Sequence, residues 1–308
     1  MTDNSVMIII VGLIAATLRV STPLILGTIG ELFCEKSGVL NLGIEGTMVI
    51  GAFIGFTVAD ATGSLWTGIL VSILAGIIAG LLMSIMTVWL GVNQHVSGLG
   101  ITLFLSAIAS YGYRLVYGEP TTPPTLDGFS VVSILPDNLL VSRITNQYLL
   151  TYIALLLIPI IWFIVNKTRI GLWIRAVGEN PEAVDAAGVN VYWTRTIALM
   201  IGGGFMALAG SFLSLAQLGA YTYGMIAGRG WVCIALIIFA NWQPSRILWG
   251  AFLFGGASAL QLRLQSLGIK VPYELFLSLP YLVTIAALAL AGRSVTSPSS
   301  MLKPYRRE

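Results

Sequence analysis

Long apolar stretches separated by short polar segments run through this chain from end to end. A membrane-spanning helix needs about 20 mostly apolar residues, and several stretches reach or approach that length. Some are short or interrupted, which is typical of discontinuous helices whose freed backbone groups line a polar cavity. The pattern predicts an all-α polytopic membrane protein with about nine transmembrane helices, within a range of about eight to ten. The candidate spans are residues 6–29, 39–59, 65–90, 96–117, 148–165, 191–215, 225–240, 247–262 and 275–291.

Composition supports this prediction. Hydrophobic residues make up 56% of the 308 residues, charged residues make up 9%, and the mean hydropathy is +0.89. Soluble domains carry about 25% charged residues, so we expect one transmembrane domain over residues 1–308 with no soluble catalytic domain. The proline-rich segment 118–147 is expected to be an irregular external loop, and residues 293–308 a cytoplasmic tail. The first apolar stretch lacks a basic start and a cleavage site, so we expect a retained span and not a signal peptide.

A polar segment at residues 167–195 interrupts the apolar pattern and contains a short, well-delimited helix. Asn180 is a good N-cap, Pro181 suits the first helical position, and Glu182 suits the positive end of the helix dipole. Gly188 can adopt the left-handed conformation that ends a helix. A rigid helix in such a loop (about residues 167–190) is either presented to a partner or lies on the lipid headgroups, and the local pattern favours a partner.

The basic residues predict the orientation, because cytoplasmic loops are enriched in Lys and Arg. Placing the 167–195 segment inside puts most of the basic residues there and fewer on the other face. The tail is then cytoplasmic and, with nine spans, the N-terminus is external. The expected inside residues are Lys36, Lys167, Arg169, Arg175, Arg195, Arg246, Arg293, Lys303, Arg306 and Arg307, and the outside ones Arg114, Arg143, Arg229, Arg263 and Lys270.

Small residues recur at helical spacing within the spans. Gly51 and Gly55, and likewise Gly76 and Gly80, are four residues apart, and a further cluster follows at residues 202–210. Such spacing lets helix backbones approach closely in a membrane. We expect close helix packing at these positions.

Polar side chains inside the spans are the candidates for a solute pathway. Asn41 and Glu45 are one helical turn apart and share a face, and a carboxylate in a span should face protein or water. They either line a path or join helices by a structural hydrogen bond, and the sequence leaves both interpretations open. Asn93 and Gln94 open the fourth span and form another polar cluster, expected near its cytoplasmic end.

Aromatic residues accompany a charge at the start of the seventh span. Arg229 and Trp231 flank Gly230, where they either hold a polar, ring-shaped solute or anchor the helix at the membrane interface. Tyr223 lies shortly before them and is a second ring on which a flat solute could stack.

The chain offers no arrangement typical of an enzyme. One histidine, His95, and two distant cysteines, Cys34 and Cys233, do not form a zinc motif or suggest a disulfide. Residues 30–37 end like a phosphate-binding loop, but Glu35 replaces the second glycine and would repel phosphate. The sequence therefore predicts a non-enzymatic protein with no metal, no cofactor and no nucleic-acid partner.

Three segments together resemble the permease subunits of ATP-binding-cassette (ABC) importers, in the branch that takes up branched-chain amino acids, ribose and nucleosides. They are residues 30–46 (GELFCEKSGVLNLGIEG), residues 175–189 (RAVGENPEAVDAAGV), and residues 227–231 (AGRGW) with 238–244 (IFANWQP) and 259–263 (ALQLR). The first and third resemble the nucleoside-type members more than the ribose or amino acid ones. Trp231 departs from the resemblance, because a smaller or non-indole aromatic is common there.

The resemblance implies a mechanism and a set of partners. Such a permease sits in the cytoplasmic (inner) membrane among lipids, pairs with a second, identical or homologous permease, and receives a small polar solute from an external binding protein. Its short cytoplasmic helix docks on an ABC ATPase subunit, which hydrolyses the ATP. The residues that carry this coupling by resemblance are Gly178, Glu179, Asn180, Pro181, Glu182, Ala183, Ala186 and Gly188.

A nucleoside is the expected solute. A simple sugar such as ribose is the alternative within the family. An ion-coupled secondary transporter is the alternative outside it, disfavoured because Glu45 has few carboxylate neighbours within the spans.

Overall fold

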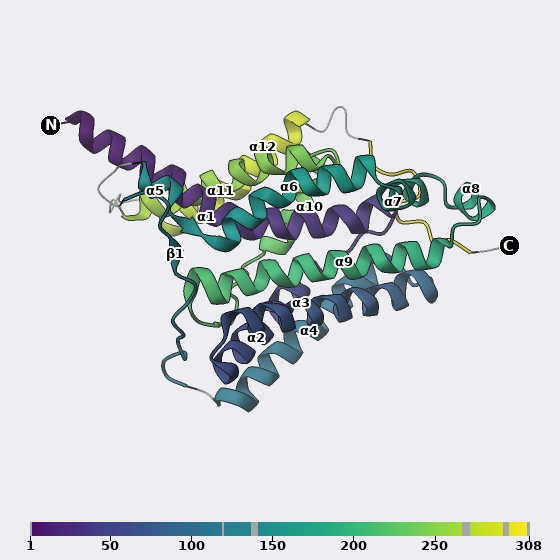
Figure 1. The fold of residues 1–308 in the computed structure, drawn as a ribbon, viewed down its shortest axis with the longest axis horizontal. Helices are drawn as coiled ribbons and strands as arrows, with labels where there is room; N and C mark the ends of the chain where they lie inside the picture. Colours follow the sequence, from purple (N-terminus) through teal and green to yellow (C-terminus); the bar gives the residue numbers. More distant parts are fainter. Residues whose placement is uncertain (1, 119, 137–140, 267–271, 292–295, 307–308) are drawn as a thin grey trace.

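The computed structural model describes the whole chain except residues 1, 119, 137–140, 267–271, 292–295 and 307–308. Its described part is a bundle of long helices with one two-stranded antiparallel ribbon (Figure 1). In chain order the elements are α1 (Thr2–Lys36), α2 (Ile44–Thr62), α3 (Leu65–Ser84), the π-helical η1 (Ile85–Trp89), α4 (Gln94–Tyr117), β1 (Val131–Val132), α5 (Ser142–Thr145), β2 (Gln147–Tyr148), α6 (Leu149–Lys167), α7 (Arg169–Glu179), α8 (Pro181–Ala186), α9 (Val191–Phe212), the π-helical η2 (Leu213–Leu218), α10 (Arg229–Phe239), α11 (Pro244–Ser266) and α12 (Tyr273–Ala291).

The all-α membrane fold predicted from the sequence is confirmed. Within the described residues, seven helices are long and apolar enough to cross a membrane, and two shorter apolar helices accompany them. The shorter ones are Arg229–Phe239 and Glu274–Ala286, which correspond to the seventh and ninth predicted spans, residues 225–240 and 275–291. The predicted first span, residues 6–29, is too short. Helix α1 runs without a break through Arg19 and Pro23 and ends only at Lys36.

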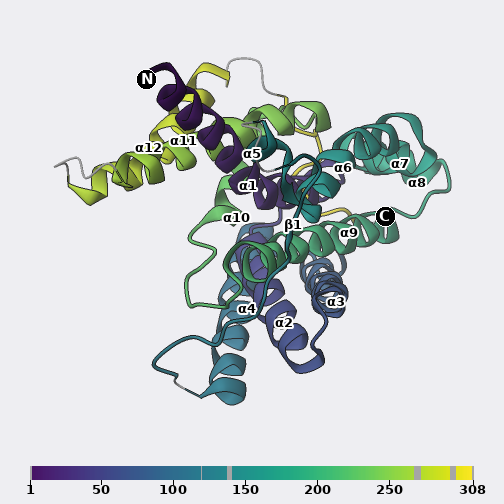
Figure 2. The same cartoon turned by 60° about the vertical axis from the view of Figure 1, so that its left-hand side comes forward.

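Helix α9 is the centre of the bundle. In Figures 1 and 2, α2, α3 and α4 lie on one side of α9, and α11 and α12 lie on the other side beyond α1. Close backbone packing of the small residues is confirmed here. A Cβ added at Gly203 would collide with the carbonyl oxygen of Gly76, and one added at Gly210 would collide with that of Met48. The bare backbones therefore set the spacing between α9 and its neighbours α2 and α3.

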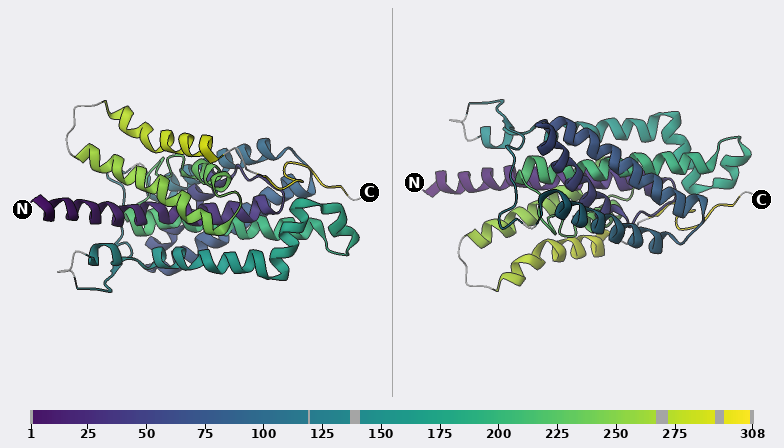
Figure 3. Two further views of the ribbon diagram at one scale, coloured as in Figure 1. Left: turned by 90° about the horizontal axis from the view of Figure 1, so that it is seen from above. Right: turned by 90° about the horizontal axis from the view of Figure 1, so that it is seen from below.

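The two ends of the bundle carry different structures. The N-terminus, β1 and α5 lie at one end, and α7, α8 and the C-terminal segment lie at the other (Figures 1 and 3). This grouping matches the two sides predicted from the basic residues, while the assignment of one end to the cytoplasm stays a prediction. Lys270, Arg293 and Arg307 of that prediction lie outside the described residues.

The short helix expected in the polar segment is present as α8. The Asn180 side chain accepts a hydrogen bond of 3.0 Å from the Ala183 N–H, and Pro181 is the first helical residue. Gly188 has φ +84°, the left-handed conformation expected after the helix end. The sequence pattern missed α7, which precedes α8 and begins at an N-cap formed by Thr168.

Candidate functional site

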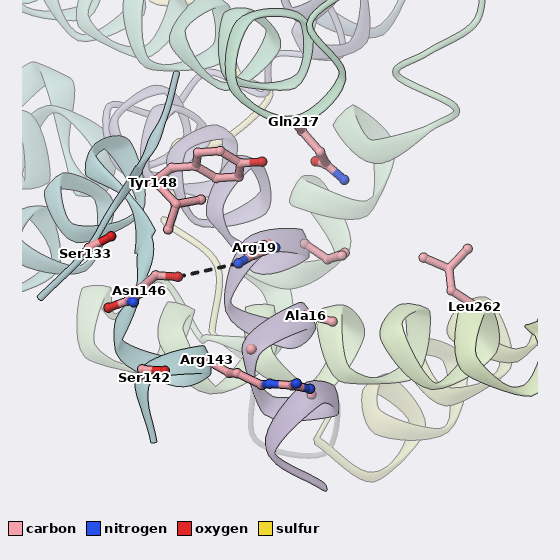
Figure 4. Close-up of a pocket in the computed structure, with 13 residues that line it drawn as sticks. Ala16, Arg19, Ser133, Ser142, Arg143, Asn146, Tyr148, Gln217 and Leu262 are labelled. Atoms are coloured by element: carbon pink, nitrogen blue, oxygen red, sulfur yellow. Dashed lines mark hydrogen bonds between the residues drawn. The ribbon is translucent and has the colours of Figure 1, made fainter. Parts of the chain in front are cut away.

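A cavity of about 770 Å³ lies where the ribbon of β1 and β2 crosses the N-terminal half of α1. We call it the Arg19 cavity, and its polar lining includes Arg19, Ser133, Asn146, Tyr148 and Gln217 (Figure 4). Ligand-binding clefts commonly measure about 300–1,000 Å³ and place a few polar groups among apolar ones. The Arg19 cavity has the size and the mixed lining of a small-solute site.

Arg19 joins the ribbon to the bundle. Its Nε donates a hydrogen bond of 2.9 Å to Oε1 of Gln147, and its Nη2 donates one of 3.4 Å to the Asn146 carbonyl oxygen. The guanidinium carbon lies 5.6 Å from the centre of the Tyr148 ring, which is a cation–π arrangement. A charged residue inside a span is stabilised in this way by a polar loop that folds back onto it.

Gln217, which belongs to neither α1 nor the ribbon, also lines the Arg19 cavity (Figure 4). It belongs to the π-helical end of the α9–η2 span, and single π-helical turns often occur at functional sites. Its Oε1 atom is buried and accepts no hydrogen bond within the described residues. A buried amide oxygen without a donor favours a ligand or water that supplies one.

A second, smaller cavity of about 170 Å³ lies next to the first. We call it the Arg229 cavity, because Arg229 and Val232 of α10 line it together with residues of α11 and α12. The two cavities share Val20, Gln217 and Leu262 as lining residues. The two cavities are therefore neighbours between the ribbon and the start of α10, and we refer to them together as the passage.

Glu45 holds the start of α10. Its Oε1 accepts a hydrogen bond of 2.8 Å from the Gly228 N–H, and its Oε2 accepts one of 2.7 Å from the Gly230 N–H. The first N–H groups of a helix have no partner within the helix, and a carboxylate satisfies them and complements the dipole. Of the two roles that the sequence leaves open for Glu45, the contacts match the structural one. Arg229 next to it donates from Nη1 to the carbonyl oxygens of Met225 and Ile226, each at 2.9 Å.

The other pathway candidates lie apart from the passage. Asn41 is buried, and its N–H donates to Glu31 Oε1 at 2.9 Å. The Gln94 side chain accepts from the Leu40 N–H at 2.8 Å, and the Asn93 side chain caps the start of α4. These three residues support the turn between α1 and α2 and the beginning of α4. Trp231 is 37% exposed and belongs to the lining of neither cavity.

Tyr223 lies in a separate pocket of about 420 Å³ between the end of α4 and the segment before α10. Its ring is 5.3 Å from that of Tyr113 and 6.3 Å from that of Tyr221, measured between centroids. Burial and the neighbouring phenols raise the pKa of Tyr221 to about 12, so its hydroxyl stays neutral. Tyr113 and Tyr221 are buried while Tyr223 is 53% exposed, and none of the three lines the Arg19 cavity.

At the opposite end of the bundle, the predicted coupling residues divide into two groups. Those of α8 form its cap and its exposed surface, with Glu182, Ala183 and Ala186 open to solvent. The two coupling residues that precede α8, Gly178 and Glu179, instead bind the C-terminal segment by hydrogen bonds. Glu179 Oε2 accepts a hydrogen bond of 2.8 Å from the Ser299 hydroxyl, and the Gly178 carbonyl oxygen accepts one of 2.9 Å from the Ser300 N–H.

Arg195 reinforces this attachment. It is 2% exposed, and it donates to the Ser37 carbonyl oxygen at 3.0 Å and to the Ser300 hydroxyl at 3.2 Å. A third hydrogen bond of 3.3 Å reaches the Lys303 carbonyl oxygen. The end of α1, the start of α9 and the C-terminal segment are thereby joined around one buried cation.

These features are those of a membrane transport protein: a helical bundle, a passage with polar lining between its helices, and a capped helix projecting from one end. The comparisons specify the class further. Residues 13–288 match the family model described as "Branched-chain amino acid transport system / permease component". The chain belongs to this family of ABC transporter permeases.

Individual relatives match along almost the whole chain. A provisionally assigned glucose ABC transporter permease of Haloferax volcanii, TsgC13, is 37% identical and covers 96% of this chain and 98% of its own length. The guanosine ABC transporter permease NupQ of Bacillus subtilis is 33% identical, over 95% of this chain and 96% of its own. The nucleoside ABC transporter permease NupC of Lactococcus lactis is 32% identical, over 94% of each. No solved structure is significantly similar to this chain.

Sequence analysis did not select Arg19, Tyr148 or Gln217 as site residues. The signal for Arg19 is its charge within an apolar span, which is costly unless a partner or a cavity compensates it. Gln217 is an uncharged polar residue at the end of a span and gives a weaker signal. Their convergence depends on the ribbon folding back onto α1, which the sequence pattern does not reveal.

Proposed function

We propose that this permease forms part of an ABC importer for a nucleoside, with a simple sugar as the second candidate. Two of the relatives above are named as guanosine or nucleoside permeases, and one as a glucose permease. The lining of the Arg19 cavity is the observation that favours a nucleoside. The Tyr148 ring and Gln217, whose side-chain oxygen accepts no hydrogen bond within the described residues, both line this cavity.

A nucleoside fits this lining by its chemistry. Its flat base stacks on an aromatic face, and its exocyclic amines and ribose hydroxyls donate hydrogen bonds to an amide oxygen. A sugar donates hydroxyls equally well but has no flat ring to stack. The passage should hold either solute weakly, because an importer must release what it accepts.

The same proposal assigns partners to the two ends of the molecule. The exposed face of α8 contacts the ABC ATPase subunit, and an external binding protein delivers solute at the end that carries β1 and α5. A second permease completes the complex, and a homologous one is the favoured choice. NupP and NupQ of Bacillus subtilis are both named as guanosine permeases, and both are similar to this chain. Under this proposal, ATP hydrolysis belongs to the ATPase subunit.

The test is uptake by the reconstituted complex of permeases, ATPase and binding protein. Labelled guanosine, uridine, glucose and leucine are offered separately, with and without ATP. We expect ATP-dependent uptake of the two nucleosides, and glucose uptake without nucleoside uptake would make the sugar the substrate. ATP-independent uptake driven by an ion gradient would contradict the importer class itself.

A substitution tests the position of the passage. Gln217→Leu keeps the size of the side chain and removes the amide, so we expect the KM for guanosine to rise by about tenfold. Tyr223→Phe removes a polar group of similar strength in the separate aromatic pocket and is the matched control. Equal KM values for the two variants would place the solute elsewhere.

A further inference from the structure

Helix α10 is bounded at both ends by strained backbone. Ala227 precedes it with φ +51°, and Asn241 and Trp242 follow it with φ +50° and +52°. They are three of the four non-glycine residues with positive φ among the described residues. Side-chain-bearing residues avoid this conformation unless the surrounding structure imposes it, and such strain concentrates at elements that move.

Two carboxylates, the half-buried one of Glu45 and the buried one of Glu35, hold these ends in place. At the start of α10, the Glu45 carboxylate binds the N–H groups of Gly228 and Gly230 as described above. At the other end, the indole Nε1 of Trp242 donates a hydrogen bond of 2.5 Å to Oε2 of Glu35. Glu35 belongs to α1, is 0% exposed, and lies 207 residues away in sequence. Each strained end of α10 is therefore fixed to the α1–α2 part of the bundle by one acidic side chain.

The contact at the second end is sparse in hydrogen-bond donors. Glu31 lies one helical turn before Glu35 on α1 and is also 0% exposed. Apart from a hydrogen bond between the two carboxyl groups themselves, no N–H or O–H group within the described residues donates to Oε2 of Glu31 or to Oε1 of Glu35. A buried acidic pair with so few donors is costly to maintain. The hydrogen bond from Trp242 to Glu35 therefore contributes strongly to holding the turn at residues 241–242 in its present position.

The end of α10 also connects to the C-terminal segment and, through it, to α7. Asn241 Oδ1 accepts a hydrogen bond of 3.3 Å from the Thr296 N–H. Three residues further along, Ser299 binds Glu179 at the end of α7, directly before α8. A displacement of α7 and α8 would therefore reach the turn at Asn241 and Trp242 through a short piece of the C-terminal segment.

The other end of α10 reaches the passage. Arg229 and Val232 line the Arg229 cavity, and one turn further Cys233 packs against α1 with its Sγ 3.6 Å from the Leu24 carbonyl oxygen. The Cys233 side chain fills the space left by Gly27, because a Cβ on Gly27 would lie 2.8 Å from Cys233 Sγ. Cys233 is a small side chain and α1 presents only a glycine to it, so no bulky interlocking side chains oppose a rigid movement of α10 along α1 at this point.

We propose that α10 is the gate of the passage and that the Trp242–Glu35 hydrogen bond is the latch that holds it closed. The C-terminal segment transmits the movement of α7 and α8 to this latch. Glu35 and Trp242 are positioning residues, which act on the solute only through α10. The proposal rests on the passage put forward under the proposed function.

The experiment compares Trp242→Phe with the wild type in the assembled complex in lipid nanodiscs. Phenylalanine keeps an aromatic ring in the buried site and removes the N–H donor. Trp249→Phe on α11 is the matched control, because Trp249 is 68% exposed and forms no part of the latch. Amide hydrogen exchange of residues 230–240 is the main measurement, and exchange of α2 reports on the general fold.

We expect exchange over residues 230–240 to accelerate by about tenfold or more in Trp242→Phe, since a hydrogen bond to a carboxylate is lost, with α2 unchanged. ATP hydrolysis per solute transported should rise as the gate opens without a signal. Glu35→Gln retains an oxygen acceptor, so exchange over residues 230–240 should stay slow in this variant. Glu35→Leu removes the acceptor and should behave like Trp242→Phe.

Exchange in Trp242→Phe that equals that of Trp249→Phe would overturn the latch. Faster exchange throughout the bundle, including α2, would also overturn it, because it would show general loosening. The solute assignment is judged separately. If exchange changes as expected while no nucleoside is transported, the latch stands and the nucleoside proposal falls.

Discussion

The packing of α2 against α9 gives a stability prediction whose size follows from the coordinates. A Cβ added at Gly51 would lie 2.5 Å from both the Cα and the carbonyl oxygen of Ala207. An ordinary contact begins at 3.4 Å, and both obstructing atoms are backbone, so a side-chain rotation cannot relieve the overlap. The helices must separate by about 1 Å to admit one methyl group.

The separation also weakens a buried hydrogen-bond site. The Ser72 hydroxyl of α3 lies 3.0 Å from the Gly51 carbonyl oxygen and 3.1 Å from that of Ala207, so it bridges α2 and α9. Overpacking of a well-packed core costs about 1–3 kcal/mol, and rigid backbone on both sides favours the upper end. Alanine regains about 1 kcal/mol over glycine in helix propensity. We therefore expect Gly51→Ala to lower the free energy of unfolding by about 2 kcal/mol.

The chain provides a matched control for this substitution. Gly100 also lies inside a helix, α4, but a Cβ added there would meet nothing within 4 Å. Gly100→Ala should therefore leave stability unchanged or raise it by up to about 1 kcal/mol. The measurement is equilibrium unfolding of the purified permease in mixed micelles with increasing SDS. If Gly51→Ala is as stable as Gly100→Ala, the backbone contacts do not set the helix spacing and the reasoning is refuted.

Three further predictions concern the ends of the bundle. Cysteines introduced at the exposed positions Thr125 and Ala186 should be labelled from opposite sides of sealed vesicles, with the two buried native cysteines unlabelled; labelling from one side would refute the topology. Arg195→Met should cost about 2–4 kcal/mol and expose the C-terminal segment to protease, because its acceptors lose a buried cation; an unchanged digestion rate would contradict this. Asn180→Ala should destabilise α8 by about 1 kcal/mol, seen as faster amide exchange confined to residues 181–187; unaltered exchange would show that the cap is dispensable.

Sequence reasoning succeeds here where the cause is local. The ends of α8 follow from Asn180, Pro181 and Gly188, each of which acts on backbone within a few residues of itself. The membrane spans follow from apolar length, and the close contacts of α9 follow from its glycines. These features require no knowledge of which helix meets which.

It fails where a function depends on distant partners. Glu45 acts 183 and 185 residues further along the chain, on the N–H groups of Gly228 and Gly230. Arg19 acts 128 residues away on Gln147. The sequence marks such residues as unusual for a span but does not say what they bind. It therefore leaves open whether a buried charge contacts the solute or the protein.

The contacts of these charges bear on how the permease selects its solute. Glu45 binds two backbone N–H groups, and Arg229 binds two carbonyl oxygens of the turn before α10. Arg19 is likewise committed to Gln147 and to the Asn146 carbonyl oxygen. Glu45, Arg229 and Arg19 therefore stabilise irregular backbone around the passage. Under the proposed function, binding of these three charges to protein groups favours a neutral, polar solute over an ion, and the exposed Arg143 is the remaining charged side chain in the lining of the Arg19 cavity.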